Sequence, residues 1–274
     1  MYTEYQPSRL LAPYIDNYWE FKGTPEYGMR IHILPDGCTD FIFTLGEVAN
    51  AVEEGSLIMQ PYRSYFVGPM TKYSELVTYT ESIHMFGVRF LPCGLSCFTN
   101  LPLHEFVNSR VSTNEMKAVF DDTFIEKLGE QKHVTDRIRV VEEYLLAYLA
   151  RHYQPADSHV AMAVNMINHS KGKRSVRSLM DDVCLCQRHF ERKFKHYTGF
   201  TPKEYSRIVK FKNAVELLRT TTSANLLTTA VDAGYYDLAH FSKEIKSMSG
   251  NTPASFLSLT VPEETTLTYI EPQR

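Results

Sequence analysis

Two stretches of the chain, 51 positions apart, share one pattern. Residues 190–205 read FERKFKHYTGFTPKEY, and residues 241–256 read FSKEIKSMSGNTPASF. The matching positions carry aromatic or aliphatic, basic, glycine, threonine and proline residues: Phe190 with Phe241, Arg192 with Lys243, Phe194 with Ile245, Lys195 with Lys246, Gly199 with Gly250, Thr201 with Thr252, Pro202 with Pro253 and Tyr205 with Phe256. So many matches at a single offset indicate two copies of one helical unit.

Each copy predicts a leading helix, a short turn and a second, cationic helix. The expected leading helices are 175–183 and 226–233, and the expected second helices are 186–197 and 237–248. Gly199 and Gly250 are expected to end the second helices, and the Thr-Pro pairs after them to restart the chain. This is the plan of a helix-turn-helix unit, whose second helix enters the DNA major groove. A long helix over 202–219 would hold the two units at a fixed separation.

This part of the chain resembles the AraC/XylS family of transcription regulators. The resemblance covers residues 160–260 and rests on Leu179, Phe190, Arg192, Phe194, Gly199, Pro202, Tyr205, Ala214, Leu217, Leu218, Ala230, Gly234, Asp237, Phe241, Gly250 and Pro253. It implies a DNA-binding regulator that contacts RNA polymerase as an activator. Such a regulator is expected to be a homodimer that responds to a small-molecule effector. Three positions depart from the family pattern: Cys186 stands at the start of a helix where a thiol caps poorly, Lys210 replaces an arginine, and Ile245 replaces a core phenylalanine.

The N-terminal part is similar to a β-domain that many of these regulators carry. That weaker resemblance rests on Tyr18-Trp19, on residues 33–37 and on the Gly-Val-Arg-Phe-x-Pro stretch at 87–92.

The second helix of each copy supplies the candidate DNA contacts. In the first copy these are Gln187, Arg188, Glu191, Arg192 and Lys195, and in the second Leu238, Ala239, His240 and Lys243. By the resemblance, Arg188, Glu191 and Arg192 face the bases; arginine suits guanine, and glutamate can accept from cytosine. Arg174 and Arg177 are expected at phosphates. The plainer interpretation is that any one of these charges belongs to a solvated face. Since Leu238 and Ala239 cannot hydrogen-bond a base, the first unit is predicted to carry most of the specificity.

The charge of the chain is unevenly divided. Residues 160–260 hold 15 Lys and Arg against 8 Asp and Glu, and the remainder holds 14 against 24. A basic block attached to an acidic body is typical of a polyanion-binding module, here double-stranded DNA.

The chain outside the repeat predicts an α+β protein with a small β-barrel or sandwich before the helical domain. Strands are expected at 30–34, 39–45, 56–59, 65–67, 75–79 and 84–90, and helices at 113–128 and 134–153. The predicted divisions are a β-rich sensing domain at 1–111, a helical linker at 112–157, an all-α DNA-binding domain with two helix-turn-helix units at 158–260, and a loose tail at 261–274. Asp157 or Ser158 is expected to cap the first helix of the DNA-binding domain.

An apolar stripe runs along the predicted helix 134–153. Its members, at helical spacing, include Ile138, Val141, Leu145 and Leu149. The stripe could form the seam of a homodimer, or it could simply pack on its own domain.

The β-domain offers candidate effector contacts. They are polar or aromatic residues on predicted strands: Trp19, Arg30, His32, His84 and Arg89. Alternation places Arg30 and His32 on one face of a strand, and His84 with Phe86 on one face of another. The plainer interpretation makes both histidines structural, Trp19 a core residue and Asp36 part of a turn. A metal-dependent enzyme and a protein-interaction switch are the alternative functions, but dispersed histidines predict no metal site and no cofactor.

Length and composition limit the number of domains and the class of protein that the chain can form. With 274 residues, 43% hydrophobic and 22% charged, the chain has room for two globular domains. No apolar run reaches the roughly 20 residues of a membrane span. The five cysteines are expected to be free thiols in a cytoplasmic protein.

Overall fold

The first half of the protein is built from two antiparallel sheets. The computed structural model describes residues 2–52, 57–116, 119–120, 122–183, 185–220, 226–254 and 268–271. The larger sheet has six strands, in the order β1 (Tyr2–Tyr5), β2 (Ile15–Gly23), β8 (Ile83–Phe90), β4 (Thr39–Thr44), β6 (Ser64–Val67) and β9 (Arg110–Ser112). The smaller sheet has four, in the order β10 (Thr268–Glu271), β3 (Met29–Ile33), β7 (Ser74–Thr78) and β5 (Asn50–Ala51).

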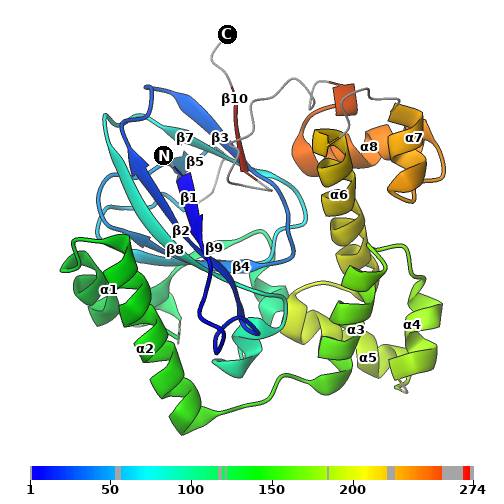
Figure 1. Ribbon diagram of the computed structural model, residues 1–274, viewed down its shortest axis with the longest axis horizontal. Coiled ribbons are helices and arrows are strands. Elements are labelled where there is room, and N and C mark those ends of the chain that lie inside the picture. The colour runs from blue at the N-terminus through cyan, green and yellow to red at the C-terminus, as the bar shows by residue number, and fades with distance from the viewer. Residues whose placement is uncertain are drawn as a thin grey trace.

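Strict alternation along β8 and β4 gives the larger sheet two apolar faces. Phe86 and Phe43 point to one face, into a core of aromatic rings shared with the helices that follow. Met85 and Ile42 point to the other face, into a second core shared with β3 and β7 of the smaller sheet. The predicted sandwich is confirmed, with an additional helical layer outside the larger sheet (Figure 1).

Two helices form that outer layer, α1 (Asp122–Gly129) and α2 (Val134–His152). Val141 and Leu145 of α2 are fully buried in the aromatic core, and Ile138 and Leu149 pack partly buried beside them. The apolar stripe is therefore used inside the chain, as the plainer of the two interpretations had it.

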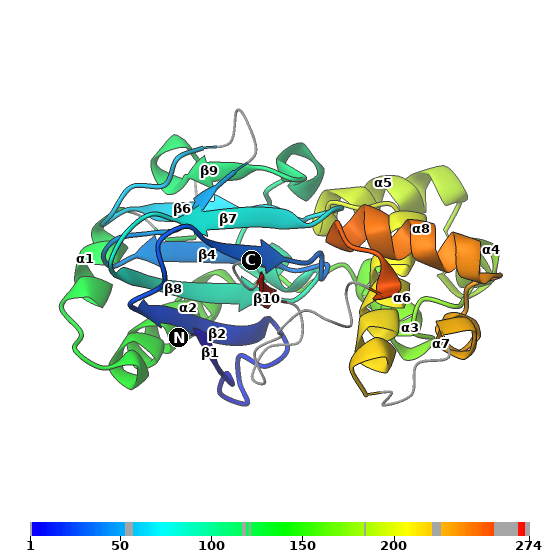
Figure 2. The same cartoon turned by 90° about the horizontal axis from the view of Figure 1, so that it is seen from above.

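The described part of the second half contains six α-helices. They are α3 (Ser158–His169), α4 (Val176–Val183), α5 (Gln187–Thr198), α6 (Pro202–Thr220), α7 (Leu226–Asp232) and α8 (Leu238–Ser249). Figure 1 shows α6 running between a lower group of α3, α4 and α5 and an upper pair of α7 and α8, and Figure 2 shows these helices together beside the two sheets. Asp157 caps α3, because its carboxylate accepts from the backbone N–H groups of His159 and Val160.

Several local predictions need correction. The expected helix 113–128 is a 3-10 turn (Thr113–Glu115) followed by the shorter α1, and residues 57–59 of an expected strand are irregular. Strands β1 and β2 were not predicted, because their apolar positions are mixed with charged and small ones. The tail was expected to be loose, yet β10 pairs with β3 at the edge of the smaller sheet. Residues 56, 184 and 261–267 lie outside the described part of the chain.

The two halves share a packed boundary. Leu34 and Cys93 of the β-domain belong to the same buried cluster as the helical core. Gly37 adopts a left-handed backbone (φ 86°), and a Cβ there would lie 2.7 Å from the ring of Tyr205 on α6. A side chain at Gly37 would therefore force the two domains apart.

Candidate nucleic-acid interface and ligand cavity

The first candidate recognition helix, α5, divides cleanly into a core face and an outer face. Phe190 and Phe194 are fully buried against the helical core. The outer residues Gln187, Arg188, Arg192 and Lys195 are exposed, and Glu191 is half-buried. Arg188 and Arg192, four residues apart, share one side of the helix and present two guanidinium groups together.

Two side chains of α5 are held within the protein. Gln187 Nε2 donates to Glu191 Oε1 at 2.9 Å, so these two residues form one polar pair on the outer face. Lys193 Nζ lies 2.6 Å from Asp157 Oδ2 and ties α5 to the start of α3. Burial acts to raise the pKa of Asp157, but the bond from Lys193 and the N–H of Val160 lower it overall. Lys193 therefore has a partner within the protein.

The second candidate recognition helix, α8, presents a more apolar outer face. Leu238, Ala239, His240 and Lys243 are all exposed, as the repeat predicted. Asp237 caps the helix, with its carboxylate accepting from the N–H of His240 at 2.7 Å. Glu244, on the inner side, accepts two hydrogen bonds from Arg207 of α6, at 2.7 and 3.1 Å.

Of the two arginines expected at phosphates, one makes contacts within the protein and the other is exposed. Arg174 pairs with Asp182 of α4, and its Nε donates to Ser178 Oγ at 3.0 Å. Arg177 is exposed. A lysine also contacts the turn between α7 and α8: Lys210 Nζ donates to the carbonyl of Gly234 at 3.3 Å and lies over the ring of Tyr235.

Both recognition helices end against the β-domain. Gly199 and Gly250 close α5 and α8 in left-handed conformations, with φ of 83° and 79°. A Cβ at Gly199 would lie 2.5 Å from Pro69, and one at Gly250 would lie 2.7 Å from Tyr73. The segment between β6 and β7 therefore touches the C-terminal ends of both helices.

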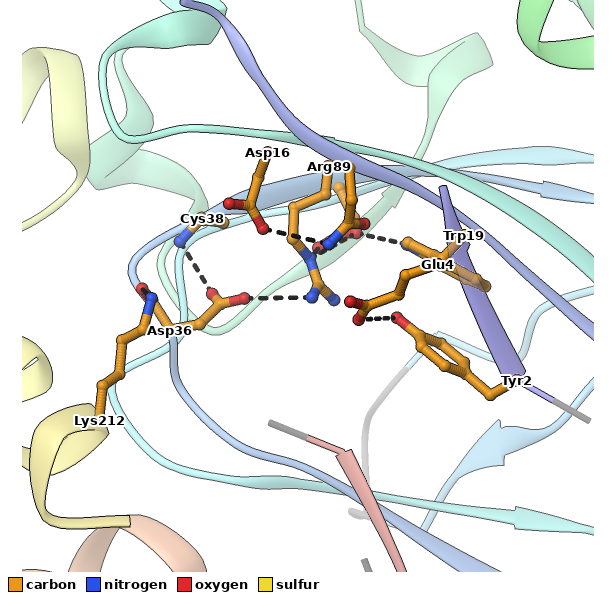
Figure 3. Close-up of polar contacts among 10 residues, drawn as sticks. Tyr2, Glu4, Asp16, Trp19, Asp36, Cys38, Arg89 and Lys212 are labelled. Carbon is orange, nitrogen blue, oxygen red and sulfur yellow. Dashed lines mark hydrogen bonds and ion pairs between the residues drawn. The ribbon is translucent and has the colours of Figure 1, made fainter. Parts of the chain in front are cut away.

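A small cavity of about 60 Å³ lies between the two sheets of the β-domain. Its wall is mostly apolar, with Trp19, Ile31 and Leu76 among its members, and Asp40 and Arg89 are polar groups in the lining. Trp19 Nε1 donates to Asp40 Oδ1 at 2.7 Å, and Arg89 Nε donates to the same oxygen at 3.2 Å. Figure 3 shows Trp19 and Arg89 with the polar groups around them. Burial raises the pKa of Asp40, while Arg89 and the bond from Trp19 act in the opposite direction.

The remaining candidate effector contacts lie away from this cavity. Arg30 is exposed and pairs with Glu75 on the neighbouring strand, and His32 stacks on Tyr73. Alternation was right that Arg30 and His32 share a face of β3, but the cavity is lined by the opposite face, through Ile31 and Ile33. His84 Nε2 lies 2.9 Å from Glu20 Oε1, on the face of the larger sheet that α1 and α2 cover.

Four carboxylates from three separate parts of the sequence gather around Arg89. Arg89 lies 3.5 Å from Asp36 Oδ2 in addition to Asp40, and Glu4 and Asp16 are close enough for its charge to lower their pKa values. Burial outweighs that effect and raises the pKa of both Glu4 and Asp16. Asp36 also shapes its turn, as expected, by accepting from the N–H of Cys38 at 2.8 Å.

Within the described ranges, no three His, Cys, Asp or Glu side chains gather in a way that could hold a metal ion. The described helices also include none that is long and apolar enough to cross a membrane. Cys38, Cys93, Cys97 and Cys186 are free thiols.

Comparison with known proteins adds two family matches and a fold. Residues 3–112 match the family described as Domain of unknown function (DUF6597), and residues 179–258 match the family described as Helix-turn-helix domain. No curated protein matches the sequence.

Two similar solved structures are both of ToxT from Vibrio cholerae. One is 9% identical with a TM-score of 0.52, and covers 88% of this chain and 98% of that one. The other, bound to (E)-4-(8-methylnaphthalen-1-yl)but-3-enoic acid, is 8% identical with a TM-score of 0.50 and covers 88% and 98%. At this identity the likeness concerns the fold. The matched segment 179–258 contains α5 to α8, so the second half of the chain carries a helix-turn-helix domain.

Proposed function

We propose that this protein is a transcription regulator of the AraC type, that it reads a specific DNA sequence with both recognition helices, and that α5 supplies most of the specificity. The observation that carries the proposal is the pair of repeated units, each with its aromatic face buried and its matching outer face exposed. The outer face of α5 holds Arg188 and Arg192, which can make bidentate bonds to guanine. The outer face of α8 begins with Leu238 and Ala239, which can touch thymine methyl groups or rest on the backbone.

Selection of bound DNA from a random pool tests this function. The full chain is expected to enrich one motif, and Arg188→Ala to relax that motif at one or two base pairs. Lys203→Ala is the matched charge control, because it changes an exposed lysine of α6 that lies outside both recognition helices. Salt-sensitive binding without any motif would reduce the helical domain to a nonspecific anchor.

We further propose that the cavity in the β-domain takes a small effector with an apolar body and a polar end. The apolar wall suits the body, and the polar end would lie near Asp40 and Arg89. A ToxT structure of the same fold holds an aromatic carboxylic acid, which favours this class of molecule. Since the cavity measures about 60 Å³, a ligand of that size would have to expand it.

Tryptophan fluorescence reports on this cavity directly, because Trp19 is the single tryptophan of the chain and lines it. Titration with the naphthalenyl butenoic acid or a saturated fatty acid is expected to change the emission, and Ile31→Phe, which fills the cavity, to abolish the change. No response to either probe, together with a stable dimer without ligand, would favour a protein-interaction switch.

The resemblance supports the remaining parts of the proposal: a homodimer, activation through contact with RNA polymerase, and action in the cytoplasm. Because Val141 and Leu145 are buried within the chain, a dimer would have to use the partly exposed Ile138 and Leu149 or a different surface.

A further inference from the structure

A second, more polar space lies between the two domains. It is a cleft of about 430 Å³, with Asp16 and Asp36 on the β-domain side and Lys171, Lys212 and Asn213 on the helical side. Its size falls within the range of small-molecule sites. It is separate from the cavity between the sheets, which has none of these five residues in its wall.

Asn213 on α6 is the feature of this cleft that indicates a ligand. The residue is only 5% exposed, and neither its Nδ2 nor its Oδ1 has a hydrogen-bond partner. A buried amide without partners is destabilising, and native proteins seldom keep one without a use. A ligand that offers both an acceptor and a donor would satisfy the two atoms together.

The β-domain wall of the cleft is acidic, and the helical wall carries two lysines beside one glutamate. On the β-domain side, the Asp16 carboxylate accepts a hydrogen bond from Asn17 at 3.1 Å, and burial raises its pKa, so a nearby cation would stabilise its charged form. On the helical side, Lys212 Nζ donates to the backbone carbonyl of Asp36 at 3.3 Å, and Lys171 is exposed (Figure 3 shows Asp16, Asp36 and Lys212). Glu216, also in the lining, is exposed and lies on the helical side.

We propose that this interdomain cleft binds a small zwitterion of the amino-acid type. Its ammonium group would face Asp16, its carboxylate would face Lys171 and Lys212, and Asn213 would bond to it from the side. Because the two walls belong to different domains, such a ligand binds only the arrangement in which they face each other. Its binding would therefore stabilise this arrangement of the β-domain and the DNA-binding domain over others.

Thermal unfolding of the full chain with each standard L-amino acid, followed by calorimetric titration of those that raise the midpoint, tests the proposal. At least one amino acid is expected to bind, and Asp16→Asn and Lys171→Met are each expected to weaken binding at least tenfold. Lys173→Met, which changes an exposed lysine two positions away and outside the cleft, is expected to leave the affinity within twofold.

Asn213→Leu supplies a variant that does not depend on charge. It removes the unpartnered amide at similar size, so the ligand-free chain should unfold at a higher temperature while the amino acid no longer binds. Three results would overturn the proposal: no amino acid binds the wild-type chain, binding survives both charge variants, or neutral sugars bind as well as the zwitterion. The first of these would mean that the cleft holds water only.

This inference goes beyond the proposed function and fails separately from it. DNA selection by the wild-type chain without added amino acid measures the recognition helices alone, whatever occupies the cleft.

Discussion

The two helix-turn-helix units have the same interior and different exteriors. Phe190 and Phe241 occupy the same position in each unit and are both fully buried, and α5 and α8 each end on a left-handed glycine. Outside the core, α5 carries arginines and begins at Cys186 without a side-chain cap, whereas α8 begins at Asp237 with one. The shared fold requires similar buried residues in both copies, whereas the residues of the outer face and of the first turn can differ between them.

The attachments of the two units also differ. The C-terminal end of α5 reaches the β-domain through His196, whose ring lies 3.1 Å from Asn100 Oδ1. The inner side of α8 is held by the paired hydrogen bonds from Arg207 of α6 to Glu244. A change in the β-domain would therefore reach the first unit through a direct polar contact.

The largest expected effect tests the shared interior. Phe190→Ala and Phe241→Ala each remove a fully buried ring, so each should lower the free energy of unfolding by ~3–5 kcal/mol. Denaturant unfolding of the full chain measures both. A large loss for one variant and almost none for the other would show that the two cores are not equivalent.

A smaller effect tests the difference at the helix starts. Asp237→Ala removes the cap of α8 and should cost about 1 kcal/mol, whereas Cys186→Ala should cost almost nothing because Cys186 caps nothing. Cys186→Ser should stabilise α5 by about 0.5–1 kcal/mol by adding the missing cap. Thermal unfolding of the three variants checks this, and equal losses at both alanine substitutions would remove the distinction.

The repeat allowed most of the helical domain to be predicted from sequence. The expected helices 186–197 and 202–219 differ from α5 and α6 by at most one residue at each end, because their glycine and proline boundaries are local signals. The β-domain was harder. The carboxylates around Arg89 come from positions 4, 16, 36 and 40, and the cleft joins Asp16 to Asn213, so only the folded chain brings them together. Alternation could pair Arg30 with His32, but it could not say which face of β3 closes the cavity.

The central claim is that α5 contributes more to DNA sequence specificity than α8 does. A base-by-base scan of a selected DNA site tests it most directly. Each base pair of both half-elements is replaced in turn, and the affinity of the full chain is measured at one fixed salt concentration. We predict penalties of ~1–3 kcal/mol at the guanine positions read by α5, lost in Arg188→Ala, and smaller penalties throughout the half-element under α8. Equal penalties across both half-elements would contradict the account.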